Sequence, residues 1–252
     1  MRRWLNQDTA ADPIQAVNCK SDPDFLTAFL PNFPREWTHP RTQVRYQIRF
    51  AGARALTAAE LDTCLNLVEQ TSGHDYRQSS LRWHPAAKRR EMRSQELRYI
   101  LINAAAAASD DGSDAVEGSG HDGPRQPQQQ QRQIQGFASF MPTYEAGWPV
   151  VYCYEIHLGA ELKGTGLGKL LMDQVIAAGE NMAAVEKIML TCFTSNVHAR
   201  AFYDRLGFGV DESSPAERTL RGKVVVPDYV ILSKATKRAL PQQADMSATN
   251  HQ

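Results

Sequence analysis

The chain has 252 residues, of which 42% are hydrophobic, so its length and composition suit one large folded domain with tails or two small domains. Its 28 basic and 28 acidic residues cancel, which excludes an overall field favouring nucleic acid, and we expect no direct nucleic-acid binding. No apolar run reaches the length of a membrane span, and the first residues lack the apolar stretch of a secretory signal.

The four cysteines stand at positions 19, 64, 153 and 192 and show neither Cys-x-x-Cys nor zinc-ligand spacing. We therefore expect free thiols in a reducing compartment and no metal site. No cysteine lies in a recognisable Cys–His arrangement, so a covalent enzyme intermediate is not expected.

Residues 1–40 are expected to form an N-terminal segment with one short helix, preceded by a loose polar stretch up to residue 21. Ser21 or Asp22 can cap this helix. The alternation of apolar residues from Arg41 to Phe50 then predicts the first strand. A helix follows at Thr57, where the pattern Thr-x-x-Glu forms a capping box.

A basic segment comes next, and Pro85 is expected to begin a helix rich in lysine and arginine. A basic helix beside an aromatic residue can bind nucleic acid, but a solvated face is commoner and is our interpretation. The run from Lys88 to Arg90 is too short to indicate nuclear import. Leu97 to Ile102 is the second predicted strand.

From Ser109 to Gln133 the only aliphatic residue larger than alanine is Val116, among many Gly, Ser, Asp and Gln residues. Such a composition cannot bury a core, so we predict a disordered insertion over residues 104–133. Ile134 to Met141 resumes as a strand, which places the insertion inside a β-hairpin. Loop-closure entropy grows slowly with length, so the fold tolerates it.

The segment from Val150 to Glu180 is read as a strand, a glycine-rich loop and an amphipathic helix. Backbone N–H groups and the helix dipole make such a junction an anion site, to which lysines at 163 and 169 add charge. The spacing of the glycines at 164, 166 and 168 fits neither the dinucleotide fingerprint nor the P-loop. It fits a basic residue followed by x-x-Gly-x-Gly, read on Lys163, Gly166 and Gly168.

The remaining chain repeats the strand-then-helix order. Glu186 to Phe193 is a strand, and Asn196 precedes a helix from Val197 to Leu206 that contains Phe202-Tyr203 and leads to Gly207-Phe208. We then expect a short strand at 208–210, a loop at 218–223, a final strand at 224–232 and a flexible C-terminal tail at 234–252.

These two motifs, in this order and spacing, resemble the GNAT superfamily of N-acetyltransferases. The resemblance implies an α+β GNAT fold over residues 41–233. Its sheet would be mixed but mostly antiparallel, with helices on both faces and a splayed parallel pair formed by strands 150–158 and 186–193. It also implies acetyl-CoA as co-substrate in the gap, held by Ile156, His157, Leu158, Lys163, Gly164, Thr165, Gly166, Leu167, Gly168, Lys169 and Asn196.

Within GNAT proteins the chain resembles the NatD family, the N-terminal α-amino acetyltransferases of histones. The resemblance rests on Tyr152-Cys153-Tyr154-Glu155, Met189-Leu190-Thr191 and Asp211-Glu212-Ser213-Ser214-Pro215, with further likeness at 76–92 and 229–233. It implies transfer of acetyl to the N-terminal Ser of histone H4 and the A-type H2 histone, by direct attack in a ternary complex. Histone tails are then the partners of a monomer in nucleus and cytoplasm. The alternatives are a GNAT acting on lysine side chains or a small amine, and a non-catalytic acyl-CoA-binding module.

Amine acetylation needs a base, and Glu155 is our candidate because the matching glutamate has that role in NatD-like enzymes. His157 is a rival base, since imidazole titrates near neutrality. Strict alternation puts Cys153, Glu155 and His157 on one side of the strand, so strand geometry alone does not choose between them. Tyr154 is a further catalytic candidate, and Tyr203 either donates to the departing thiolate or only packs on its helix.

Residues expected around the incoming N-terminus share family positions, with ordinary packing or loop capping as the alternative: Tyr76, Glu145, Tyr152, Tyr154, Ser213, Ser214 and Tyr229. Alternation places Tyr152 and Tyr154 on one face with Ile156 and Leu158. The chain departs from the family at Thr143, where an acidic partner for a basic tail is expected. One exposed ion pair is worth less than about 1 kcal/mol, so this departure affects affinity more than reaction type.

Overall fold

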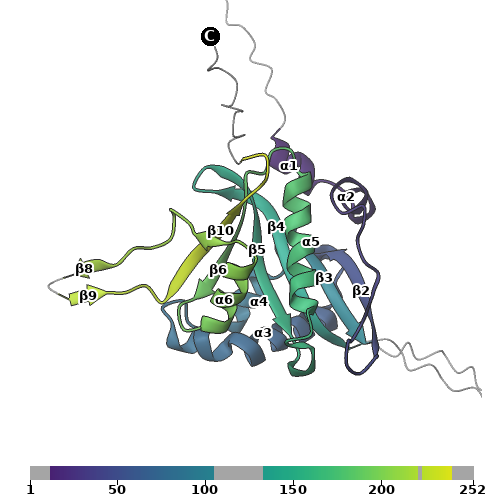
Figure 1. Ribbon diagram of the computed structural model, residues 1–252, viewed down its shortest axis with the longest axis horizontal. Helices are drawn as coiled ribbons and strands as arrows, with labels where there is room; N and C mark the ends of the chain where they lie inside the picture. Colours follow the sequence, from purple (N-terminus) through teal and green to yellow (C-terminus); the bar gives the residue numbers. More distant parts are fainter. Residues whose placement is uncertain (1–11, 105–132, 221–222, 240–252) are drawn as a thin grey trace, which may run out of the picture.

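The computed structural model describes residues 12–104, 133–220 and 223–239, and its centre is one eight-stranded sheet (Figure 1). The described strand pairs are antiparallel except β5 with β6, as the sequence predicts. In spatial order the strands are β1 (Glu36–Thr38), β2 (Arg45–Gly52), β3 (Arg98–Ala104), β4 (Ile134–Glu145), β5 (Trp148–Leu158), β6 (Lys187–Phe193), β10 (Tyr229–Ala235) and β7 (Gly209–Val210).

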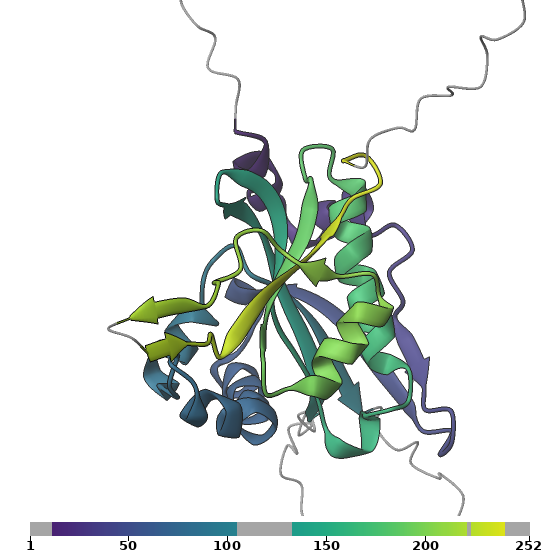
Figure 2. The same cartoon turned by 60° about the vertical axis from the view of Figure 1, so that its left-hand side comes forward.

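Helices cover both faces of this sheet, which confirms the expected α+β class (Figure 2). On one face lie α1 (Pro13–Asn18), α2 (Asp22–Phe29), α5 (Leu167–Asn181) and α6 (Val197–Arg205). On the other lie α3 (Ala58–Gln78) and α4 (Pro85–Glu91). Short 3-10 turns occupy Ala53–Ala55 and Ala160–Leu162. Within the described ranges, none of these helices has both the length and the apolar character to cross a membrane.

Two apolar cores hold the layers together, one on each face of the sheet. Phe25, Phe140 and Leu171 are fully buried on the α2–α5 face, whereas Tyr99 and Phe137 are fully buried on the α3 face. The capping box at Thr57 is formed as predicted, with the Thr57 hydroxyl accepting from the Glu60 N–H at 3.2 Å. The sheet therefore separates two hydrophobic cores, each packed against its own set of helices.

The N-terminal segment is more ordered than predicted. Asp12 caps α1 by accepting from the Ile14 N–H at 2.9 Å, and Ile14 and Val17 are buried. These two apolar residues, three apart, bury one face of a helix where we expected a loose chain, so that expectation was wrong for residues 13–18. The expected helix is present as α2, and β1 adds a strand within residues 1–40.

The region before the final strand also differs from the prediction. The expected loop at 218–223 and the start of the strand expected at 224 form a hairpin, β8 (Arg218–Leu220) with β9 (Lys223–Val225), which projects from the sheet (Figures 1 and 2). The final strand instead begins at Tyr229 and runs to Ala235. The next residue, Thr236, is also buried, so the chain stays packed against the protein beyond the predicted end of this strand. The bulk of the predicted insertion and the end of the predicted tail lie outside the described residues.

A β-bulge in β5 changes which side chains face the two cores. Ser139 pairs with Glu155 and Phe140 with Cys153, so Tyr154 is an extra residue on β5. Cys153 consequently packs against Met172 of α5 at 3.9 Å, whereas Glu155 turns toward α4. Our expectation that Cys153 shares a side with Glu155 and His157 was wrong, because strict alternation fails at a bulge. Ile156 and Leu158 likewise pack on the α5 face, away from Tyr154.

Candidate active site

A cavity of about 360 Å³ opens where β5 and β6 part. The parallel pairing ends at Cys153 with Leu190, and beyond this point the two strands no longer pair with each other. The cavity is lined from α3, α4, β5, β6 and α6, and its walls include Tyr76, Lys88, Glu155 and Tyr203. The predicted splay of the two strands therefore creates a site that brings the catalytic candidates together.

Glu155 is the most constrained charged group in this cavity. It is 6% exposed, and each carboxylate oxygen has one partner. Lys88 Nζ donates to Oε1 at 2.8 Å, and His157 Nε2 lies 2.5 Å from Oε2. Two oxygens have four lone-pair positions, so Glu155 keeps acceptor capacity for a substrate or a water.

Burial and neighbouring charges act on Glu155 in opposite directions. Burial alone would raise the pKa of its carboxyl, but the hydrogen bond and charge of His157, together with Lys88, hold the pKa below its usual value. The pKa of the Lys88 ammonium is raised, because the charges of Glu155 and Glu91 outweigh its burial. Glu155 is thus a carboxylate at neutral pH.

Lys88 corrects our interpretation of the basic helix as a solvated face. Its side chain is only 11% exposed, and it joins Glu91 at 2.7 Å to Glu155. Its ammonium also lies 5.1 Å from the centre of the Tyr76 ring, a cation–π contact. At least one cation of α4 therefore belongs to the site.

Three aromatic residues predicted for substrate binding form the cavity wall. The rings of Tyr152 and Tyr154 lie 5.2 Å apart, and Tyr76 packs edge-on against Phe193 at 4.9 Å. The Tyr152 hydroxyl is within 2.6 Å of the Thr191 hydroxyl. Burial raises the pKa of both Tyr76 and Tyr152 to about 12, so these hydroxyls stay protonated and can donate.

The glycine-rich loop leads into α5 as predicted. Gly164 and Gly166 have φ of 69° and 89°, and a Cβ at either would meet no atom within 4 Å. No side chain caps α5 after Gly166, so the first N–H groups of this 15-residue helix remain open to an anion. Lys169 pairs with Asp173 at 2.7 Å, while Thr165 donates to the Leu162 carbonyl at 2.6 Å.

Two predicted residues come from the start of α6 and its second turn. Asn196 caps α6 by accepting from the Ala199 N–H at 3.0 Å, and its side chain lines the cavity. Tyr203 is buried, and burial raises the pKa of its phenol well above the usual value. Its ring also packs against Phe208, so packing and donation to a leaving group are both compatible with its place.

Three predicted substrate residues do not line this cavity. Ser213 donates to Asp211 at 2.6 Å, and Ser214 accepts from the Ile231 N–H at 3.0 Å, so both serve the structure of their own loop. Tyr229 pairs with Phe193 at the start of β10. Glu145 does line the cavity, beside Tyr152.

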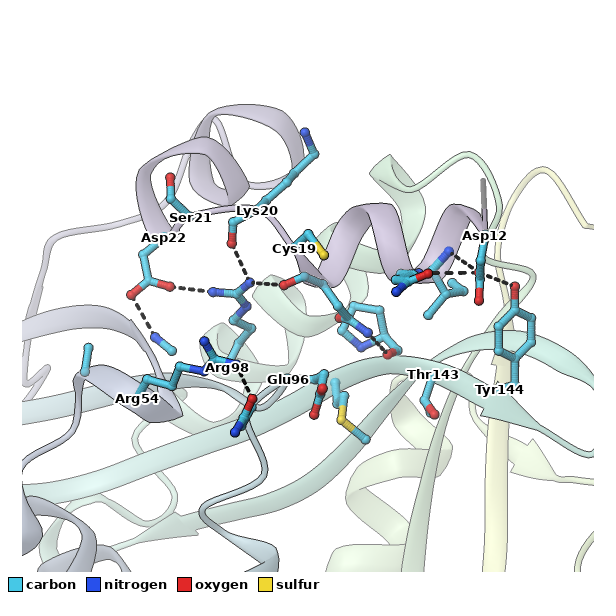
Figure 3. A pocket seen from close by; sticks show the side chains of 18 residues that line it. Asp12, Cys19, Lys20, Ser21, Asp22, Arg54, Glu96, Arg98, Thr143 and Tyr144 are labelled. Carbon is cyan, nitrogen blue, oxygen red and sulfur yellow. Dashed lines mark hydrogen bonds and ion pairs between the residues drawn. The ribbon is translucent and has the colours of Figure 1, made fainter. Parts of the chain in front are cut away.

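A second cavity, of about 920 Å³, lies between α1, the start of α2, the end of β2, the start of β3 and the end of β4 (Figure 3). Arg98 donates there to the Asp22 carboxylate at 2.5 Å and to the Lys20 carbonyl at 2.7 Å. Thr143 lines this cavity and not the first one. The catalytic candidates Glu155, Tyr154 and Tyr203 all lie in the smaller cavity, which is therefore the candidate active site.

Sequence reasoning missed Lys88, Thr71 and Thr191. The Thr71 hydroxyl lies 2.5 Å from His157 Nδ1 and donates to the Leu67 carbonyl at 2.7 Å. Thr71 follows Leu67 and Val68, which are buried on α3, and this periodicity was the available signal that it faces the sheet.

Comparison with known protein families gives a match over part of the chain. The sequence profile of the acetyltransferase (GNAT) family matches residues 126–208, which include the splayed strand, the glycine-rich loop and α6. This segment of the chain therefore resembles the GNAT family of acetyltransferases.

The particular relationship follows from two relatives. N-alpha-acetyltransferase 40 of Saccharomyces cerevisiae is 28% identical over 201 residues, covering 66% of this chain and 60% of the yeast protein. This similarity confirms the expected relationship with the NatD family. The 5-NmdU N-acetyltransferase of Pseudomonas phage PaMx11 is 37% identical over 78 residues, covering 31% of this chain and 51% of that protein. The matches thus span less than two thirds of the length of either relative.

Among solved structures, Arabidopsis thaliana NAA60 in complex with a bisubstrate analogue superposes with a TM-score of 0.48 and 11% identity. The superposition covers 76% of this chain and 99% of that chain.

Proposed function

We propose that the chain is an N-terminal α-amino acetyltransferase that transfers acetyl from acetyl-CoA to a protein N-terminus. The observation that carries this proposal is the buried carboxylate of Glu155, held in the cavity where β5 and β6 part. The similarity to N-alpha-acetyltransferase 40 supports an N-terminal amine as the acceptor.

The place of acetyl-CoA follows from the anion site at the start of α5. The open N–H groups after Gly166 suit the pyrophosphate, and the positive φ of Gly164 and Gly166 lets the backbone approach it. The pantetheine arm would then run along the part of β5 that does not pair with β6, toward Asn196. This path leads the thioester to the cavity that Glu155 and Tyr203 line.

The chemistry starts with proton removal from the substrate ammonium. Glu155 accepts this proton, directly or through a water, and the neutral amine attacks the thioester carbonyl. The C–S bond breaks as the amide forms, and Tyr203 is the candidate proton donor to the departing thiolate. The nitrogen then loses its second proton, which restores the phenol of Tyr203, so the reaction releases one proton in all, the one taken up by Glu155. Because an α-ammonium has a pKa of roughly 7.7–8.0 against about 10.4 for lysine, an N-terminal amine suits a carboxylate base better.

The protonation and position of Cys153, the cysteine next to the site on β5, favour direct attack in a ternary complex over a covalent intermediate. Burial raises the pKa of the Cys153 thiol to about 12, and its sulfur lies on the α5 face beside Met172. A thiol that remains protonated and faces away from the base is a poor nucleophile. An acetyl-cysteine intermediate at this position is therefore not part of the proposed mechanism.

The proposed substrate is the N-terminal Ser of histone H4 and of the A-type H2 histone, on the strength of the NatD-like motifs. Tyr76, Tyr152 and Tyr154 would surround the first residue, and Glu145 would meet a basic side chain further along. Ser213, Ser214 and Tyr229 would contribute only from outside the cavity. We further propose a monomer that acts in the nucleus and the cytoplasm.

Turnover of acetyl-CoA against three peptides tests this function. The peptides are a histone H4 N-terminal peptide with a free Ser amine, the same peptide with that amine blocked, and a peptide beginning with Met. Activity on the free-Ser peptide alone is the expected result. Equal activity on the blocked peptide would assign the enzyme to lysine side chains, and binding of acetyl-CoA without turnover of any peptide would favour a binding module or a small amine substrate.

A further inference from the structure

Both ring nitrogens of His157 are already occupied by protein groups. Nε2 lies 2.5 Å from Glu155 Oε2, and Nδ1 lies 2.5 Å from the Thr71 hydroxyl. Both Glu155 and His157 are 6% exposed. His157 therefore has no nitrogen left for a substrate and can act on one only through Glu155, which separates the two candidate bases that the sequence left open.

The Thr71 hydroxyl determines which nitrogen of His157 carries a hydrogen. A threonine hydroxyl has one hydrogen, and Thr71 donates it to the Leu67 carbonyl at 2.7 Å. Its oxygen then presents a lone pair to Nδ1, which must donate. In the neutral ring Nε2 is consequently the bare, basic nitrogen, and it faces the carboxylate oxygen of Glu155.

This arrangement addresses a weakness of Glu155 as a base. When the His157 ring is charged, Nε2 donates to Oε2 and, together with Lys88, holds the pKa of the Glu155 carboxyl below its usual value against the effect of burial. When the ring is neutral, Nε2 has no hydrogen to donate and Glu155 meets the substrate as an ordinary carboxylate. Transfer of a proton from an α-ammonium to such a carboxylate is unfavourable by more than about a thousandfold. A proton placed between Oε2 and Nε2 is bound by two acceptors and removes the repulsion between their lone pairs.

We propose that Glu155, His157 and Thr71 form one proton-accepting unit, in which Glu155 meets the substrate and His157 shares the proton that Glu155 takes up. Thr71 and His157 are positioning residues, since neither touches the reacting amine. In this step the ammonium loses one proton and becomes the neutral amine, and that proton comes to lie between Oε2 and Nε2. It returns to solvent through Glu155 after the product leaves. This inference rests on the proposed acetylation of an amine.

The charged and aromatic groups packed around Glu155, His157 and Thr71 contact other atoms than Oε2 of Glu155, which contacts His157. From α4, Lys88 occupies Oε1 of Glu155 and is itself held by Glu91. From α3, Tyr76 lies beneath the Lys88 ammonium, and from β3, Tyr99 lies close enough to interact with the Glu155 charge. From β4, the Phe137 ring packs beside His157, with the two ring centres 5.5 Å apart. Lys88 therefore fixes Glu155 without competing for the shared proton.

One variant of His157 and one of Thr71 distinguish proton sharing by His157 from a purely structural role in which His157 only holds Glu155 in place. In H157Q the amide can still donate to Glu155 but cannot take up a proton, and in T71V the hydroxyl that orients Nδ1 is absent. With the free-Ser H4 peptide we expect H157Q to lose roughly tenfold to a hundredfold in kcat at pH 7, with KM for acetyl-CoA unchanged. The loss should shrink as pH rises past about 8, because the substrate amine then deprotonates by itself. T71V should show a smaller loss with the same pH dependence, and T71S should restore activity.

Three results would overturn the inference. The first is an H157Q profile that matches the wild type at every pH, and the second is a loss that is equally large at every pH, which would indicate support alone. The third comes from ¹⁵N NMR of histidine-labelled protein without substrate: we expect Nδ1 of His157 to carry hydrogen in the wild type, and a bare Nδ1 would contradict the unit even if no variant folds. Absence of wild-type turnover would instead overturn the proposed function, and the NMR result would still test the pairing.

Discussion

Two buried carboxylates in this protein are each paired with a lysine, yet only one of them can do chemistry. Glu155 accepts from Lys88 at 2.8 Å, and Asp211 accepts from Lys187 at 2.6 Å. Glu155 also lines the cavity between β5 and β6. Asp211 is also held by Ser213 of its own loop, whose N–H and hydroxyl both donate to it, and by the Ser233 side chain.

The two sites show similar electrostatics. Burial would raise both pKa values, but hydrogen bonds from the lysine and from a second partner outweigh it and lower both. A lowered pKa and an ion pair therefore do not identify a base. Access to a cavity does, and the bulge at Tyr154 is what gives Glu155 that access by turning it away from the α5 core.

The largest expected effect follows from Glu155→Gln. The variant keeps the volume of the side chain but removes the proton acceptor, so we expect kcat with the free-Ser peptide to fall by roughly 10² to 10⁴. Binding of acetyl-CoA, measured by calorimetry, should stay within about twofold. Glu69→Gln, which changes an exposed carboxylate of α3, is the matched control. Unchanged turnover in Glu155→Gln would remove this residue from the mechanism.

Asp211→Asn should instead reduce stability. It leaves Lys187, whose side chain is 16% exposed, without its charged partner, and we expect a loss of about 3 kcal/mol in the free energy of unfolding. Because folding lowers the pKa of Asp211, this stabilisation is present above the unfolded pKa near roughly 3.9 and is lost as pH falls toward the folded value. Urea unfolding at pH 7 and pH 3 measures both. An equal difference between wild type and variant at the two pH values would contradict this account.

Gly166→Ala should weaken acetyl-CoA binding. Gly166 has φ of 89°, where a residue with a Cβ costs about 1–2 kcal/mol, so KM for acetyl-CoA should rise by roughly 5- to 30-fold. Gly147→Ala provides a control with the same strain, since Gly147 has φ of 87° in the β4–β5 turn. An equal rise in both variants would mean that the effect is general strain and not the loss of an anion site.

Thr143→Asp should have the smallest effect. Thr143 lines the cavity beside α1, so a carboxylate here would meet a basic substrate tail only where the peptide extends past the Glu145 cavity, and such exposed pairs are worth less than about 1 kcal/mol. KM for an H4 peptide that keeps its arginine should therefore fall by less than about fivefold, while Thr143→Asn, which adds no charge, should leave it unchanged. No difference between the two variants would indicate that the peptide does not pass Thr143.

Periodic and capping signals predicted most of the fold because they depend on local sequence. The capping box at Thr57, the alternation up to Phe50 and the loop before α5 all appear where expected. The hairpin of β8 and β9 was missed because its strands have three residues each and, in the described part of the chain, pair with each other and not with the main sheet, so they are too short to show an alternation.

The site was predicted less completely, because its key contacts join residues that are far apart in sequence. Lys88 reaches Glu155 from a different helix, and Thr71 reaches His157 across the α3 face. The bulge at Tyr154 arises from the pairing of β4 with β5, and nothing in the alternation of β5 alone reveals it. Asp211 binds Ser213, so a family position there has a structural use that sequence cannot separate from substrate contact.

The position of the transferred acetyl group tests the central claim most directly. A histone H4 N-terminal peptide with a free Ser amine and free lysines would be incubated with acetyl-CoA and the wild-type protein, and the product fragmented in a mass spectrometer. The account predicts that the added acetyl lies on the α-amine of the first residue. Acetyl found on a lysine side chain instead would contradict it.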